Sequence, residues 1–174
     1  KNAAEISSWM DTFAENFLAN EPVAGMTLLV GKGDDIAVAR SFGYADLENE
    51  TVSKLETVYQ IGSLTKQFTA VAILQLEEQG KLQLSDDITQ YLPDYPTYGN
   101  KITIADILYH TSGIKNYIAV GYSDSRVAPG RLVNDAEYRL DLKPEEMTTF
   151  FKHEALEFSP GTSWNYSNSG YYLA

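Results

Sequence analysis

A β-hairpin without enough partner strands is the feature of this sequence that most constrains its fold. The apolar runs Met26–Val30 and Ile36–Phe42 flank the turn sequence Gly31–Asp35, a pattern typical of a hairpin. An isolated two-stranded hairpin is marginal in water and needs further strands or a covering layer. The other periodic segments predict helices. We therefore expect an α+β fold whose antiparallel sheet is completed by strands outside these 174 residues.

Helical patterns lie on both sides of the hairpin. Apolar residues at helical spacing predict an amphipathic helix over 4–19, and residues 43–60 are expected to be a polar connection. Residues 64–79 are apolar on most faces, which is typical of a buried helix, with Gly80 as its C-terminal stop. The other expected elements are a short helix capped by Ser85–Asp87, a helix from a Thr103 capping box through Tyr109 that is closed near Gly113, a long loop over 114–142, a helix over 144–153, a turn at Ser159–Gly161 and a helix N-capped by Asn168. We expect residues 1–60 to form a helix plus hairpin of a sheet domain, and residues 61–174 a mostly helical domain.

Composition excludes several classes of partner and site. Hydrophobic residues make up 44% and charged residues 21%, which is ordinary for a globular protein. A net charge of −11 disfavours nucleic acid and anionic lipid as partners. No apolar stretch is long enough to predict a membrane span. The absence of cysteine excludes thiol chemistry, and two histidines without close pairing argue against a zinc site.

The end of the chain suggests a piece of a longer protein. The apolar run that ends at Ala174 has no cap and no polar tail. We therefore expect an N-terminal part of a larger protein, interrupted inside a helix, with the remaining C-terminal portion as its structural partner. The chain begins without methionine, so we expect its start to follow a signal peptide or to be an arbitrary boundary.

Ser63 and Lys66 are the first candidate pair for chemistry. Residues at i and i+3 share a helix face, and a nearby amine can accept the proton of a serine hydroxyl if its pKa is depressed. The spacing alone is weak, because Ser112 and Lys115 repeat it. Ser63, however, opens the most apolar helix, whereas Ser112 lies at an expected helix end. A plain N-cap serine remains the alternative for Ser63.

Tyr166 and Asn168 are the second candidate pair. A phenol can relay a proton, and an amide can hold an amine and a carbonyl together. Tyr98 and Asn100 have the same spacing, so a buried tyrosine and an N-cap asparagine remain the alternative. For His110 we expect a structural role, since a lone histidine at a helix end more often satisfies a carbonyl than performs catalysis.

Four segments in order resemble the serine β-lactamase and penicillin-binding-protein family, in particular its class C-like branch of D-alanyl-D-alanine carboxypeptidases and esterases. They are Gly43–Asp46, Gly62–Thr69, Leu108–Gly113 and Phe158–Tyr171. The resemblance implies that Ser63 is the acylated nucleophile, Lys66 its partner, Tyr166 the tyrosine that shuttles the proton with Lys66, and Asn168 a contact to the substrate amide. The reaction implied is acylation of Ser63 by an amide, ester or β-lactam carbonyl, followed by hydrolysis. A small-molecule or peptide substrate, no metal or organic cofactor, and a periplasmic or secreted location are implied with it.

The family's third motif is missing from this stretch of sequence. A Lys-Thr-Gly or His-x-Gly strand should follow well after residue 174, and it borders the cleft and supplies an oxyanion donor. The resemblance therefore implies an enzyme in the complete protein and little or no activity in these residues alone. Two alternatives stay open: a penicillin-recognising sensor that is acylated without turnover, and a relative that kept the fold and lost the chemistry.

Overall fold

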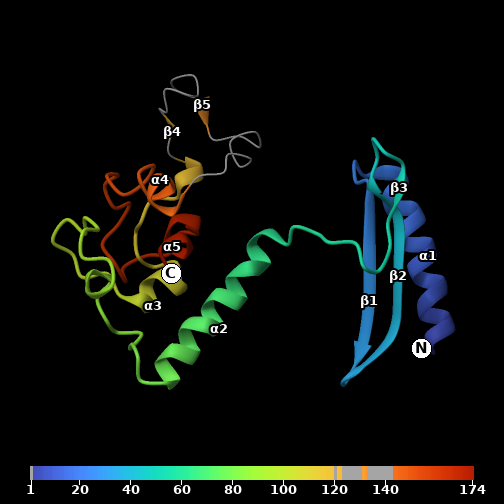
Figure 1. Ribbon diagram of the computed structural model, residues 1–174, viewed down its shortest axis with the longest axis horizontal. Helices are drawn as coiled ribbons and strands as arrows, with labels where there is room; N and C mark the ends of the chain where they lie inside the picture. Colours follow the sequence, from blue (N-terminus) through green and yellow to red (C-terminus); the bar gives the residue numbers. More distant parts are fainter. Residues whose placement is uncertain (1, 120, 123–130, 133–142) are drawn as a thin grey trace. The chain divides into compact units, whose positions relative to one another are not determined.

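The computed structural model describes residues 2–119, 121–122, 131–132 and 143–174 (Figure 1). The chain forms two compact units, Lys1–Gln60 and Ile61–Ala174, and each is described by itself. The fold class is α+β, as predicted, with helices and antiparallel strands.

The first unit is a three-stranded antiparallel sheet with one helix. Helix α1 spans Ala3–Asn20, and the strands are β1 (Gly25–Lys32), β2 (Asp35–Asp46) and β3 (Thr51–Val52), in the order β1-β2-β3. The predicted hairpin and first helix are confirmed. The polar connection predicted over 43–60 is partly wrong, because β2 continues to Asp46 and β3 pairs with it.

Two paired glycines let β1 and β2 approach each other at the end of the hairpin opposite its turn. Gly25 pairs with Gly43, and a Cβ at Gly25 would overlap the carbonyl oxygen of Tyr44. A Cβ at Gly43 would overlap the carbonyl oxygen of Ala24, and Gly43 has a positive φ of 71°. Glycine is therefore required on both strands, which the β-propensity of the flanking residues did not reveal.

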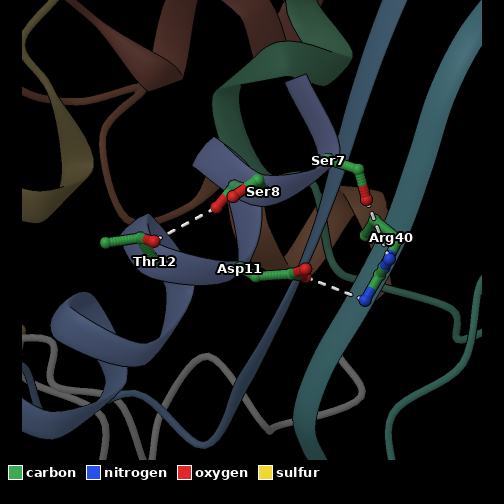
Figure 2. A network of polar contacts seen from close by, with 5 residues as sticks. All are labelled: Ser7, Ser8, Asp11, Thr12 and Arg40. Atoms are coloured by element: carbon green, nitrogen blue, oxygen red, sulfur yellow. Dashed lines mark hydrogen bonds and ion pairs between the residues drawn. The ribbon is translucent and has the colours of Figure 1, made fainter. Parts of the chain in front are cut away.

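Helix α1 is attached to β2 by packing and by a small polar network (Figure 2). Met10 and Ala14 are buried, whereas Arg40 of β2 donates to Ser7 Oγ at 2.9 Å and pairs with Asp11 at 2.8 Å. The ion pair is about half exposed, so it contributes little, and burial of the two apolar side chains accounts for most of the attachment.

Four hydroxyls link the sheet to the segment that ends this unit. Thr27 Oγ1 lies 3.1 Å from Tyr59 Oη, and Ser53 Oγ lies 2.9 Å from the same oxygen. Ser41 bridges Thr27 and Ser53. The hydrogen bonds from Ser53 and then Thr27 lower the pKa of Tyr59.

The second unit contains short helices around an isoleucine-rich core. Its elements are a 3-10 turn (Gly62–Leu64), α2 (Thr65–Glu78), a 3-10 turn (Ile88–Gln90), α3 (Ile104–Leu108), a 3-10 turn (Tyr117–Ala119), β4 (Gly121–Tyr122), β5 (Arg131–Leu132), α4 (Pro144–Thr148) and α5 (Asn168–Leu173). The core consists of Ile88, Ile102, Ile107, Ile114 and Phe151. Helices α3 and α5 pack together, and a Cβ at Gly170 would lie 3.7 Å from Ile107.

Helix α2 forms where it was expected but is not buried. Of its own residues Ile73 is buried, whereas Phe68 is 62% and Val71 53% exposed. Gly80 follows with a φ of 69°, as expected of a C-terminal stop. The prediction of a buried helix is wrong for this structure, because the described residues leave much of its apolar surface uncovered.

Two further helices are shorter than predicted. Helix α4 ends at Thr148 rather than at residue 153, and the Oγ1 atoms of Thr148 and Thr149 donate to the carbonyls of Glu145 and Glu146. β-Branched threonines disfavour a continuing helix, and Phe151 then turns into the core. The helix predicted after Ser85–Asp87 is a single 3-10 turn, N-capped by Asp87.

The end of α3 and the loop over 114–142 also differ from the prediction. The Thr103–Asp106 capping box is confirmed, but the positive φ that follows the helix belongs first to His110 (61°) and only then to Gly113 (73°). The described part of 114–142 contains the paired strands β4 and β5. Residues 120, 123–130 and 133–142 of the predicted loop lie outside the described residues.

Candidate active site

Ser63 lies on the 3-10 turn that leads directly into α2. Its side chain is exposed, and its Oγ is 2.6 Å from Tyr166 Oη and 3.4 Å from Lys66 Nζ. Leu64 occupies the N-cap position of α2 and provides no side-chain cap. The alternative of a plain N-cap serine is therefore wrong, because the hydroxyl is directed to a phenol and an amine instead.

Lys66 connects the two candidate pairs. It follows Ser63 by three residues, is partly buried, and donates to Asn168 Oδ1 at 2.7 Å. Its Nζ also lies 4.9 Å from the ring centre of Tyr166 and 5.5 Å from that of Tyr171. Aromatic faces attract cations, so these rings and the amide oxygen hold the ammonium beside the serine.

Tyr166 is presented by a segment that pairs with the chain after α3. Ser159–Gly161 forms the predicted turn, in which Thr162 donates its amide to the Ser159 carbonyl and Gly161 has a φ of 77°. The amides of Glu157, Gly161 and Asn165 then donate to the carbonyls of Gly113, Thr111 and His110. A Cβ at Gly113 would overlap the carbonyl oxygen of Phe158, so glycine lets the two segments approach.

Asn168 faces Lys66 because it does not cap its helix. The N-cap of α5 is Ser167, whose Oγ accepts from the amide of Gly170 at 3.2 Å, and Asn168 is the first helical residue. The prediction of an Asn168 N-cap is wrong by one residue. This shift leaves the Asn168 side chain available to accept from Lys66.

The protonation equilibria of the site are perturbed in opposite directions. Burial alone would raise the pKa of Tyr166, but its hydrogen bonds to Lys66 and Ser63 and the lysine charge outweigh burial and hold this pKa below its usual 10. Burial and then the Tyr166 charge raise the pKa of Tyr171. Burial and the charge of Lys66 lower the pKa of His110 below 6.5. Tyr166 is thus the phenol of this cluster that ionises more readily.

The residues that repeat the two spacings have other partners. Ser112 is buried and accepts from the amide of Ile114, whereas Lys115 pairs with Glu154 at 3.0 Å. Tyr98 donates to the Lys152 carbonyl at 3.5 Å, and Asn100 donates to its own turn. The structure thus brings together Ser63, Lys66, Tyr166 and Asn168, and it leaves the second copy of each spacing apart from them.

Sequence reasoning missed the support that the Leu108–Gly113 segment provides to Tyr166. It also expected His110 to satisfy a carbonyl or stabilise a helix end, whereas the His110 Nδ1 accepts from the backbone amide of Ser167 at 3.2 Å. Periodicity carries no signal for such a pairing of distant loops. The available sequence signal was the glycine at position 113, because glycine permits the positive φ and the close approach of this pairing.

Neither a metal cluster nor a membrane-spanning helix occurs in the described ranges. In them, no three histidine, cysteine, aspartate or glutamate side chains gather as a metal site. No helix within the same ranges has the length and apolarity to cross a membrane.

Comparisons with known proteins point to one family. The Beta-lactamase family model matches residues 10–174. PbpX of Bacillus subtilis (strain 168), which carries the name of a penicillin-binding protein, is 34% identical over 156 residues, covering 90% of this chain and 34% of the relative. The chain thus spans about a third of the length of the curated relatives it matches.

Solved structures share the fold. The octameric penicillin-binding protein homologue of Pyrococcus abyssi has a TM-score of 0.76 and 31% identity, over 96% of this chain and 37% of the other. A D-stereospecific amidohydrolase of a Streptomyces species has a TM-score of 0.71 and 28% identity, over 94% of this chain and 45% of the other. The match over residues 10–174 shows that the chain belongs to the Beta-lactamase family, whose larger fold it covers in part.

Proposed function

We propose that this chain carries the nucleophile half of an active-site-serine hydrolase that works through an acyl-enzyme. The observation that carries the proposal is the contact of 2.6 Å between Ser63 Oγ and Tyr166 Oη, beside the ammonium of Lys66. An exposed serine within hydrogen-bond reach of a base is the arrangement that nucleophilic catalysis needs.

The distances favour Tyr166 as the group that takes the proton from Ser63. Its oxygen is closer to Ser63 Oγ than Lys66 Nζ is, and its lowered pKa raises the phenolate fraction at neutral pH. Lys66 supplies the positive charge that keeps this pKa low. Asn168 holds Lys66 through Oδ1, and its amide NH2 can donate to a substrate carbonyl.

These side chains and water can carry the protons through both acylation and hydrolysis. Ser63 Oγ bonds to the carbonyl carbon while its proton passes to Tyr166 and the carbonyl electrons move to oxygen. Collapse of this intermediate breaks the bond to the leaving nitrogen or oxygen, which takes the proton. Water attacks the acyl-serine ester by the reverse proton route and regenerates Ser63.

The substrate class is an amide, ester or β-lactam carbonyl, presented by a small molecule or a peptide. A Streptomyces relative of the fold is named as a D-stereospecific amidohydrolase, and other relatives are named as penicillin-binding proteins, which supports this range of acyl donors. We place the complete protein in the D-alanyl-D-alanine carboxypeptidase and esterase branch, with a periplasmic or secreted location. Residues 1–174 alone should show little or no turnover, because the chain spans about a third of its relatives.

The decisive experiment treats the full-length protein with a fluorescent penicillin and a fluorophosphonate, and maps the adduct by mass spectrometry. We expect the label on Ser63 and its loss in Ser63→Ala. Ser112→Ala is the matched control and should retain labelling, because Ser112 is buried and bonded within its own loop. Labelling that persists in Ser63→Ala would refute the nucleophile.

The same experiment separates the alternative functions. Steady release of product after the first acylation supports the hydrolase. A burst of acylation without turnover would instead make this protein a penicillin-recognising sensor. No labelling by either probe would indicate a relative that kept the fold without the chemistry.

A further inference from the structure

His110, which contacts the ring of Tyr166, has a geometry that an ordinary packing role does not require. We infer that His110 is a positioning residue for acylation: its neutral imidazole holds Tyr166 against Ser63, and its protonation releases that hold. The inference rests on the proposed function and adds a pH-sensitive support to the same site.

His110 is bonded to both neighbours of Tyr166 in the chain. The amide of Asn165 donates to the His110 carbonyl at 3.0 Å, and the amide of Ser167 donates to His110 Nδ1 at 3.2 Å. One bond uses the backbone and the other uses the side chain. The position of the Tyr166 backbone is therefore held from both sides by a single residue.

The imidazole also packs against the tyrosine ring itself. The ring centres of His110 and Tyr166 are 4.5 Å apart, and Tyr171 and Trp164 lie 5.1 and 6.1 Å away, the latter edge-on. Contacts of this kind restrict the ring orientation of Tyr166, and its hydroxyl is the atom that meets Ser63.

The bond from Ser167 requires the neutral form of His110. A nitrogen that accepts a hydrogen bond carries no proton, so the single proton of the ring is on Nε2. Protonation would place an N–H against the Ser167 N–H and remove the acceptor. Among the residues that the structure describes, three titratable groups face the imidazole: Lys66 from α2, Tyr166 from the turn before α5, and Tyr171 from α5.

The charge of Lys66 makes a second cation unfavourable here. Lys66 Nζ lies over the rings of Tyr166 and Tyr171, the same two rings that contact His110. Burial and this charge lower the pKa of His110, so the neutral support persists through neutral pH and fails on acidification. We expect acylation to show an inflection below pH 6.5 that belongs to His110.

The backbone of His110 suggests a matched pair of variants. Its φ of 61° is left-handed, a conformation that asparagine and glycine both tolerate. His110→Asn keeps a neutral acceptor near the position of Nδ1 and cannot titrate. His110→Gly keeps the backbone conformation and removes the acceptor and the ring.

The experiment measures the acylation rate constant of the full-length protein with fluorescent penicillin from pH 4.5 to 9. Wild type and His153→Asn, which changes the exposed second histidine of this chain, should share the inflection below pH 6.5. His110→Asn should stay within about threefold of wild type at neutral pH and lack that inflection, whereas His110→Gly should lose about tenfold or more. A role in packing alone would not remove an inflection from the profile.

Several results would overturn the inference. It fails if His110→Asn keeps the low-pH inflection, or if His110→Gly acylates as fast as wild type. Should His110→Gly not fold, the profile of His110→Asn decides alone. Absence of acylation in the wild type at every pH would instead overturn the proposed function, which is a separate and recognisable outcome.

Discussion

Two stretches of this chain contain a serine followed three residues later by a lysine, and they differ in what surrounds them. Ser63 is exposed on the turn that leads into a fourteen-residue helix, and its hydroxyl contacts Tyr166 and Lys66. Ser112 is buried in a tight loop and accepts a bond from Ile114, two residues away, while Lys115 reaches Glu154. The two stretches share only the spacing of serine and lysine. The difference therefore teaches that the surroundings of each serine depend on the distant segment that contacts it.

The lysines should separate the two stretches most sharply. Lys66→Met removes the charge beside Ser63 and Tyr166, and we expect acylation to fall by about a thousandfold. Lys115→Met removes a partly exposed pair with Glu154, so acylation should stay within about twofold of wild type. Stopped-flow measurement with a fluorescent penicillin checks both, and equal losses would erase the distinction between the stretches.

The tyrosines extend the same comparison. Tyr166→Phe deletes the oxygen that lies 2.6 Å from Ser63, and we expect about a hundredfold slower acylation. Tyr98→Phe is the matched control, because Tyr98 makes a bond of 3.5 Å to a backbone carbonyl. A Tyr166→Phe variant that acylates at the wild-type rate would transfer the role of base to Lys66.

Gly113, next to Ser112, tests whether that stretch is structural. Gly113→Ala places a Cβ on the Phe158 carbonyl oxygen at a residue with positive φ. Gly99→Ala also places a Cβ at a residue with positive φ, but no neighbouring atom lies within 4 Å of it. Both should destabilise the protein, and Gly113→Ala by about 2 kcal/mol more. Urea unfolding of the two variants measures the difference, and equal midpoints would show that the Phe158 contact adjusts without cost.

Ser112 itself should matter for stability and not for acylation. Ser112→Ala leaves the amide of Ile114 without its acceptor, at a cost of about 1 kcal/mol or somewhat more. The acylation rate should remain that of wild type. A variant with unchanged stability and slow acylation would contradict the assignment of Ser112 to the scaffold.

The smallest expected effect is on stability at acid pH. Because the pKa of His110 is lowered from 6.5 in the folded state, the unfolded chain binds a proton first as pH falls. The contribution of neutral His110 is complete above about pH 6.5 and is lost as pH falls below that value. The unfolding midpoint of His110→Asn should depend less on pH between 6.5 and 5 than that of wild type, and identical slopes would refute this linkage.

Several elements followed from local sequence because local bonds and periodicity specify them. The hairpin around Gly33 and Asp34, the Thr103–Asp106 capping box and the Ser159–Gly161 turn form where their residue types predict. The third strand at Thr51–Val52 was not predictable, because two residues carry no period. The end of α4 at Thr148 depended on threonine hydroxyls and on burial of Phe151.

The candidate residues of the site were named from sequence, but their assembly was not. The chain contains a second copy of the spacing of each candidate pair, Ser63 with Lys66 and Tyr166 with Asn168. Composition and spacing therefore could not choose between the two copies. The order of the family segments favoured the earlier copy of the serine and lysine pair and the later copy of the tyrosine and asparagine pair. Neither spacing nor order indicated that Ser167 would cap α5 and leave Asn168 to Lys66.

The sequence by itself determined the α+β class, the helix that follows Ser63 and the turn before Tyr166, since each depends on residues near one another in the chain. Tertiary structure alone decided that Ser63 meets Tyr166 and that His110 binds both neighbours of that tyrosine. Those contacts join residues far apart in sequence, and they form only when the segments after α3 and before α5 pair through their backbones. Nearly any sequence can form backbone pairing of that kind, so side-chain patterns do not predict it.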